Sequence, residues 1–130
     1  MENLTKNLKI LLIINAIIGL GFAVLYLAVS HLYLSLIHWP FYDPYYSWAF
    51  GGIFLILSIF ILITLKKNQW GKCKTVFEIN IAWQIMFLIL NITSLIFIQA
   101  PINSIITTWI YNIIFIILIV INIKFYNKYR

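Results

Sequence analysis

The sequence predicts an all-α integral membrane protein, a four-helix bundle with up-down-up-down topology. The first observation is composition: the 130 residues are 64% hydrophobic and 9% charged, with a mean hydropathy of +1.02. Soluble domains carry about a quarter charged residues. With this small number of charged side chains, the chain cannot cover a compact core with polar surface. Lipid must therefore be its main solvent. The second observation is that the apolar residues form four long runs, and together these observations exclude a water-soluble globule.

The four apolar runs are predicted to be transmembrane helices. A helix needs about 20 apolar residues to cross about 30 Å of hydrocarbon. The runs are continuous rather than alternating, and lipid offers no partner for unpaired backbone amides, so helices are favoured over a barrel. No repeat or linker divides the chain, which predicts one domain, 1–130. The predicted spans are residues 10–29, 46–65, 76–98 and 104–123.

Positive charge marks the ends of these spans. The nine Lys and Arg residues lie before the first span, between the second and third, and after the fourth. The positive-inside rule therefore predicts that both termini and the middle connection are cytoplasmic, with residues 30–45 and 99–103 outside. Because the cations follow span ends, the net charge of +6 does not indicate a nucleic-acid partner. We expect the first span to be retained, because it is longer than a usual signal-peptide core.

Two acidic residues stand at predicted helix starts. Thr75 to Glu78 fits a capping box, and Asp43-Pro44 fits an N-cap followed by proline at the first helical position. The alternative for Glu78 is a proton carrier inside the membrane. If both acids are caps, no carboxylate remains deep in the bilayer for proton coupling or acid–base catalysis. The single cysteine, Cys73, excludes an internal disulfide or a CxxC redox pair.

The connection after the first span contains a candidate metal site. His31 and His38 are seven residues apart and share one side if the first helix continues to Pro40. With Asp43 they could form an outward-facing metal or proton-responsive site. The alternative is that both histidines simply lie in the headgroup layer.

Residues 38–48 are rich in aromatic side chains. Such side chains gather at membrane interfaces, where the ring is buried and its polar edge is wet. The functional alternative is a lid over a binding site for a lipid or quinone head. The candidate ligand-binding residues in this segment are Trp39 and Tyr42.

Amide side chains line one face of the third span. Asn80, Gln84 and Asn91 recur at spacings of four and seven, and Asn112 on the fourth span could meet them. We expect these amides to be buried, with Ile81, Leu88 and Leu95 nearer to lipid. The amide side chains are candidates either for hydrogen bonds between helices or for a ligand site. Asn15 and Ser58 could join the same face.

Small residues on the first two spans predict close helix packing, because they let two backbones approach. They are Ala16, Gly19 and Ala23 on the first span and Gly51, Gly52 and Ser58 on the second.

The middle of the chain contains, in order, the segment Tyr42 to Gly52, the pair Lys66-Lys67 and Trp70. This order of features resembles that of small DoxX-like four-helix membrane proteins. Such proteins often show Asp-Pro, then Trp and Gly, then a basic turn. The resemblance implies a four-helix fold and, for a few members, an association with quinone-linked oxidoreductases. It assigns no catalytic residue.

These observations favour a non-enzymatic binding or accessory subunit that contacts membrane lipid, a quinone or another membrane protein. The first alternative is a small transporter or channel assembled as a homo-oligomer. The second is a membrane redox or lipid-modifying enzyme that uses His31, His38 and Asp43. No recognised catalytic motif is present, and no cofactor is indicated. The high content of Ile, Lys and Asn favours an AT-rich prokaryotic genome and the cell membrane.

Overall fold

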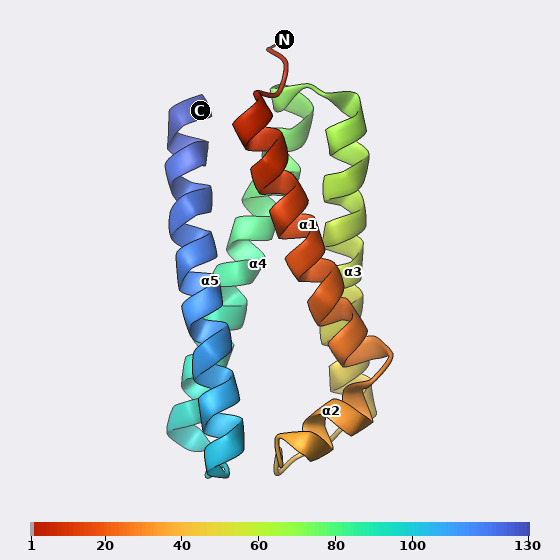
Figure 1. Ribbon diagram of the computed structural model, residues 1–130, viewed down its shortest axis with the longest axis vertical. Coiled ribbons are helices and arrows are strands. Elements are labelled where there is room, and N and C mark those ends of the chain that lie inside the picture. The colour runs from red at the N-terminus through yellow and green to blue at the C-terminus, as the bar shows by residue number, and fades with distance from the viewer. Residues whose placement is uncertain (1) are drawn as a thin grey trace. The chain divides into compact units, whose positions relative to one another are not determined.

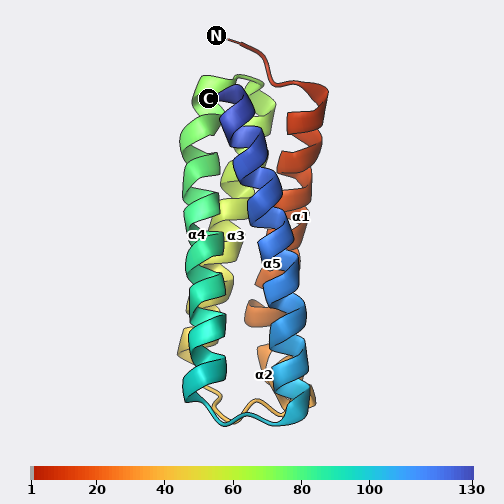
Figure 2. The same cartoon turned by 90° about the vertical axis from the view of Figure 1, so that its left-hand side faces the viewer.

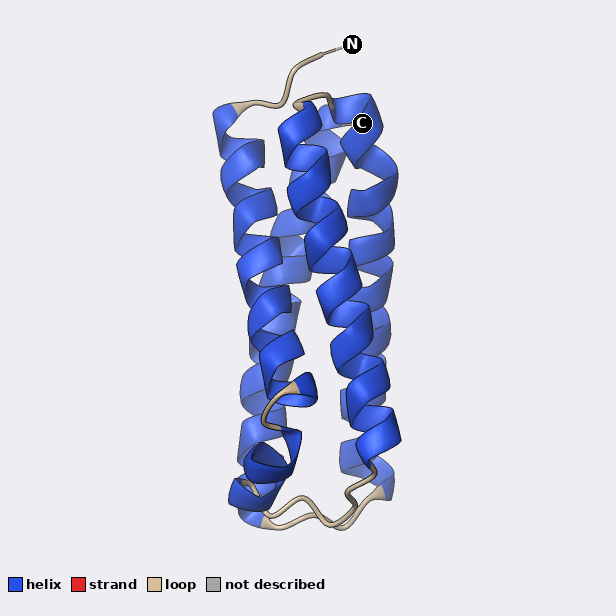
Figure 3. Cartoon of the chain, turned by 90° about the vertical axis from the view of Figure 1, so that its right-hand side faces the viewer, coloured by secondary structure: helices blue, strands red, loops and turns tan. Residues whose placement is uncertain are grey.

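The computed structural model describes residues 2–130, and over these residues the protein is helical with no strand (Figures 1 and 3). Four helices are long and apolar enough to cross a membrane. The predicted all-α class with four spans is therefore confirmed. The helices are α1 (Lys6–Leu27), α2 (Ser30–Leu36), α3 (Pro44–Lys67), α4 (Trp70–Phe97) and α5 (Ile102–Tyr129).

The chain divides into two compact units. Unit 1 comprises Pro44–Asn80 and the described residues of Met1–Ser30, and unit 2 comprises His31–Asp43 and Ile81–Arg130. Unit 1 thus holds α1, α3 and the first part of α4. Unit 2 holds most of α2, the rest of α4 and all of α5.

Unit 1 is built on close packing of α1 against α3. A Cβ atom on Gly19 would collide with Ser58 Oγ, and one on Gly51 would lie 2.6 Å from Leu27 Cγ. The two helices are antiparallel, because Gly19 meets Ser58 whereas Leu27, later in α1, meets Gly51, earlier in α3. Gly52 differs from the prediction, because no atom lies within 4 Å of where its Cβ would be. Ala16 and Ala23, by contrast, are buried as expected.

The hairpin between α3 and α4 is closed by hydrogen bonds. The Cys73 thiol donates to the Thr64 carbonyl over 3.2 Å, and Cys73 is completely buried, at 0% exposure. The segment before α1 lies along the turn: the Leu4 amide donates to the Asn68 carbonyl, and the Trp70 amide donates to the Glu2 carbonyl. These contacts hold the start of α4 well before residue 76.

The capping box predicted at Thr75 and Glu78 is therefore wrong. Helix α4 begins at Trp70, and the Gln69 carbonyl accepts from the Lys72 and Cys73 amides at 3.1 and 3.2 Å. Thr75 and Glu78 lie inside the helix with exposed side chains. The helix begins before the apolar run because Lys72, Lys74 and Thr75 can be helical outside hydrocarbon. The other predicted start is confirmed, because α3 begins at Pro44, directly after Asp43.

The first span does not continue to Pro40. Helix α1 ends at Leu27, where the Val24 carbonyl accepts from both the Ala28 and Val29 amides. Helix α2 is separate and ends in a Schellman motif, in which the Trp39 amide donates to the Leu34 carbonyl and the His38 amide to the Ser35 carbonyl. His38 is the left-handed residue of this motif, with φ of 56°.

Unit 2 is built on α5 and the part of α4 from Ile81 onward, which lie next to each other and are joined by a short turn (Figure 2). The Phe87 and Phe115 ring centroids are 5.0 Å apart, and Asn122 reaches Gln84 further from the turn. The two helices are therefore antiparallel. The end of α2 is attached to α5 by a hydrogen bond of 2.5 Å from Ser104 Oγ to the Ile37 carbonyl.

Candidate functional site

Unit 1 contains one pair of buried amides that satisfy each other. Asn80 Nδ2 on α4 donates to Asn15 Oδ1 on α1 over 2.9 Å, and Asn15 Nδ2 donates to the Leu11 carbonyl over 2.8 Å. Both side chains are buried, which confirms the expected burial of Asn80. This geometry is that of a structural hydrogen bond between membrane helices.

Unit 2 contains a second pair. Asn122 Nδ2 on α5 donates to Gln84 Oε1 on α4 over 2.9 Å, and both side chains are buried. Burial of Gln84 was expected, but sequence analysis missed Asn122, because it lies at the end of the apolar run beside Lys124. Its signal is its spacing: it follows the buried residues Asn112, Phe115 and Ile119 at steps of three, four and three.

Two further amide side chains in unit 2 have buried polar atoms without a hydrogen-bond partner. Asn112 is 0% exposed, and neither its Nδ2 nor its Oδ1 atom has a hydrogen-bond partner. Asn91 is half-buried, and its Nδ2 atom is also buried without a partner. Buried polar groups in proteins are nearly always paired, so each of these atoms needs an explanation.

The register of α4 and α5 places these two amides at one level. Asn91 is four residues after Phe87, and Asn112 is three residues before Phe115. In antiparallel helices both steps lead about one turn in the same direction along the same faces, about 4.5 to 6 Å at 1.5 Å per residue. The register therefore places Asn91 and Asn112 at about the same height, one turn closer to the α4–α5 connection than the Phe87–Phe115 pair. We call this level the Asn91–Asn112 site.

Neighbouring hydroxyl groups supply no donor to this site. Ser94 Oγ donates to the Asn91 carbonyl over 2.7 Å, and Thr108 Oγ1 donates to the Ser104 carbonyl over 2.8 Å. Each hydroxyl hydrogen is thus used within its own helix. The donors and acceptor of the Asn91–Asn112 site face a largely apolar surrounding, in which Phe87 and Phe115 are buried.

The lipid-facing side of α4 differs from the expectation. Ile81, Leu88 and Leu95 are only partly exposed. The most exposed apolar residues of this helix lie on the opposite side of the buried amides and include Ile79, Met86, Ile89, Ile96 and Phe97. The expected residues flank the buried stripe, because they are one or four positions away from an amide on a helix with 3.6 residues per turn.

The residues predicted around the outer connection are arranged differently. His31 lies on α2 with its ring 5.4 Å from that of Tyr42, in an edge-on contact, and His38 belongs to the helix end. His31, His38 and Asp43 are exposed, and Trp39 is half-buried. Among residues 2–130, no three or more His, Cys, Asp or Glu side chains are grouped so that they could hold a metal ion.

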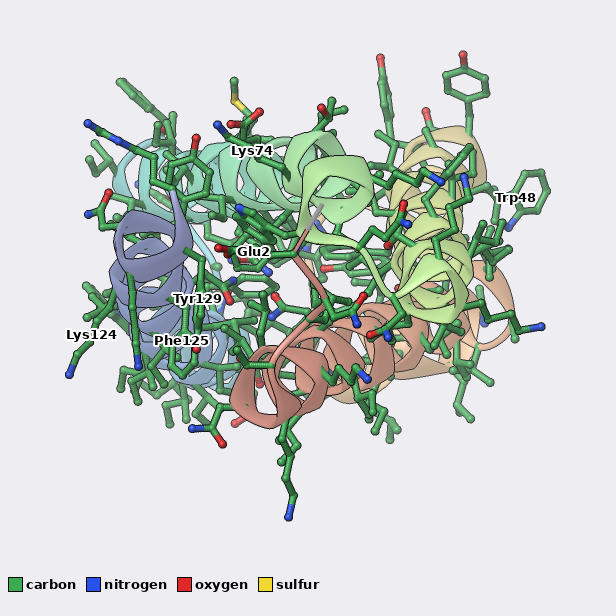
Figure 4. The ribbon with its side chains drawn as sticks, turned by 90° about the horizontal axis from the view of Figure 1, so that it is seen from above. Glu2, Trp48, Lys74, Lys124, Phe125 and Tyr129 are labelled. Atoms are coloured by element: carbon green, nitrogen blue, oxygen red, sulfur yellow. The ribbon has the colours of Figure 1, made fainter. Side chains whose placement is uncertain are left out.

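The aromatic residues at the start of α3 face outward. Tyr45, Tyr46 and Trp48 are well exposed. Figure 4 shows Trp48 pointing away from α3, as Lys124 points away from α5. This arrangement is typical of an aromatic belt at a membrane interface.

No protein-family model, curated protein or solved structure matches the chain. Its class is defined by the fold: a polytopic membrane protein with four candidate membrane spans.

Proposed function

We propose that the protein acts in the membrane by binding, as a non-enzymatic subunit that takes up a lipid or quinone. The observation that carries this proposal is the Asn112 side chain, which is fully buried with both polar atoms unpaired. An unpaired buried polar group costs about 1 to 3 kcal/mol of stability. A ligand that forms hydrogen bonds with the amide offsets that cost. The resemblance to DoxX-like proteins is compatible with a quinone as this ligand.

The two paired amides support the choice of site. Asn80 bonds to Asn15, and Gln84 bonds to Asn122, so these four side chains already serve the fold. Asn91 and Asn112 do not. We therefore assign ligand binding to Asn91 and Asn112, and structural roles to Asn80 and Gln84.

Native mass spectrometry from mild detergent tests the proposal. The wild-type chain should retain a lipid or quinone, and Asn112→Leu, which keeps the side-chain size and removes both polar atoms, should lose it. Asn15→Leu is the control, because it removes a buried amide of unit 1. Identical co-purified molecules in wild-type protein and Asn112→Leu would refute the proposal. The same spectra report copy number and so address the homo-oligomer.

We further propose that the protein resides in the cell membrane of a prokaryote with both termini cytoplasmic. The support is the distribution of Lys and Arg at span ends. Because Cys73 is buried, cysteines introduced at exposed Asn103 and Lys128 are the useful probes. A membrane-impermeant maleimide should label Asn103→Cys in sealed cells and Lys128→Cys only after lysis. The reverse pattern would overturn the orientation.

A further inference from the structure

The Asn91–Asn112 site has a defined set of hydrogen-bonding atoms. Asn112 offers one acceptor, Oδ1, and a donor group, Nδ2, while Asn91 offers a second donor group, Nδ2. Any group that satisfies this site must therefore both donate and accept. A carbonyl or an ether only accepts and would leave Asn112 Oδ1 unpaired.

The surroundings of the site select against charge. Residues 79–123, which include the site and most of α4 and α5, contain no Asp, Glu, Lys, Arg or His. Burial of a phosphate, carboxylate or ammonium group there would leave it without a counter-ion, which is strongly unfavourable. The matching group is therefore neutral.

A hydroxyl group meets both conditions. Its hydrogen is donated to Asn112 Oδ1, and its two lone pairs accept from Asn112 Nδ2 and Asn91 Nδ2. We infer that the Asn91–Asn112 site binds the neutral hydroxyl group of an amphipathic membrane molecule. This inference rests on the proposed function. It narrows the lipid to a glycerolipid with a free hydroxyl, and it replaces the quinone by its reduced form, a quinol.

The position of Asn91 indicates the side from which a ligand can reach the Asn91–Asn112 site. Asn112 is completely covered, but Asn91 is half-buried, and its helix neighbours Leu90 and Ile92 are about two-fifths exposed. Leu90 and Ile92 lie on either side of Asn91, so an apolar tail can stay in the lipid along one of these flanks of α4 while the hydroxyl reaches Asn91 first and then Asn112. A bound molecule of this kind would keep its tail in hydrocarbon and bury only its head.

The test is thermal unfolding of delipidated protein in nanodiscs with matched probes. Diacylglycerol has a free hydroxyl, and triacylglycerol with the same acyl chains has none. A quinol and the corresponding quinone form the second matched pair. We expect one hydroxyl-bearing probe to raise the midpoint of unfolding in a concentration-dependent manner. Its partner without a hydroxyl should bind at least about tenfold more weakly, because the acceptor Asn112 Oδ1 then stays unpaired.

Two variants test whether the shift in the unfolding midpoint arises at the Asn91–Asn112 site. Asn112→Leu should abolish the shift, and Asn91→Leu should weaken binding by several-fold through loss of one donor. Asn15→Gln, which changes an amide of unit 1, should leave the shift unchanged. Asn112→Leu should also unfold at a higher temperature than the wild-type protein without probe, which shows that it is folded.

The outcomes separate the two proposals. A response to the diacylglycerol pair identifies a glycerolipid, and one to the quinol pair identifies a quinol. Equal shifts with and without the hydroxyl overturn this inference but leave lipid binding intact. No shift with any of the four probes overturns it as well. If native mass spectrometry finds no lipid or quinone co-purified with the wild-type chain, the proposed function itself is refuted.

Discussion

Replacement of Gly51 by alanine is expected to disrupt the contact between α1 and α3. The added Cβ would lie 2.6 Å from Leu27 Cγ and 3.0 Å from both the Leu27 backbone nitrogen and Tyr26 Cβ. Carbon atoms pack at about 3.5 to 4.0 Å, so the overlap with Leu27 is about 1 Å. The Leu27 side chain can rotate, but its backbone nitrogen moves only with α1. The helices must therefore separate locally or bend.

The magnitude follows from two opposing effects. Overpacking of this kind typically costs about 1 to 3 kcal/mol. Alanine also favours helix over glycine by up to about 1 kcal/mol in water. The adjacent Gly52→Ala variant isolates this second effect, because no atom lies within 4 Å of its added Cβ. We expect Gly51→Ala to be less stable than Gly52→Ala by about 1 to 3 kcal/mol.

Reversible unfolding by SDS in mixed micelles, followed by circular dichroism, measures this difference. A second pair repeats the comparison on α1: Gly19→Ala places its Cβ against Ser58 Oγ, and Gly21→Ala meets no atom within 4 Å. Ser58 Oγ already donates to the Phe54 carbonyl over 2.8 Å, so its displacement also breaks that bond. Equal stability within both pairs would show that α1 and α3 do not pack as described.

Three further predictions concern single contacts. A double-mutant cycle of Asn15→Ala and Asn80→Ala should give a coupling of about 0.6 to 1.7 kcal/mol in SDS unfolding, and zero coupling would contradict the hydrogen bond. A permeant maleimide should react with buried Cys73 much faster after unfolding, and equal rates would contradict its burial. Thr75→Ala should change stability by less than about 0.5 kcal/mol, because Thr75 is exposed within α4, whereas a loss near 1 kcal/mol would restore its role as a cap.

The parts of this structure that its sequence predicts are those set by local sequence patterns. Four apolar runs define the spans because every membrane helix must cross a hydrocarbon layer of about the same thickness. The Asp43-Pro44 pair marks the start of α3 because proline lacks the amide that a helix start leaves unpaired. Burial of Asn80 and Gln84 follows because an amide that faces lipid has no hydrogen-bond partner.

Tertiary contacts decided the rest. The start of α4 at Trp70 depends on backbone contacts with Glu2 and Leu4, which are distant in sequence. Gly51 and Gly52 are identical neighbours, yet only Gly51 faces α1, because helix rotation is set by the packed partner. The same holds for the asparagines: all five of Asn15, Asn80, Asn91, Asn112 and Asn122 suit a helix interface equally in sequence. Which of them find partners, and which keep free hydrogen-bonding atoms for a ligand, depends on the register between helices, a property that composition and periodicity do not contain.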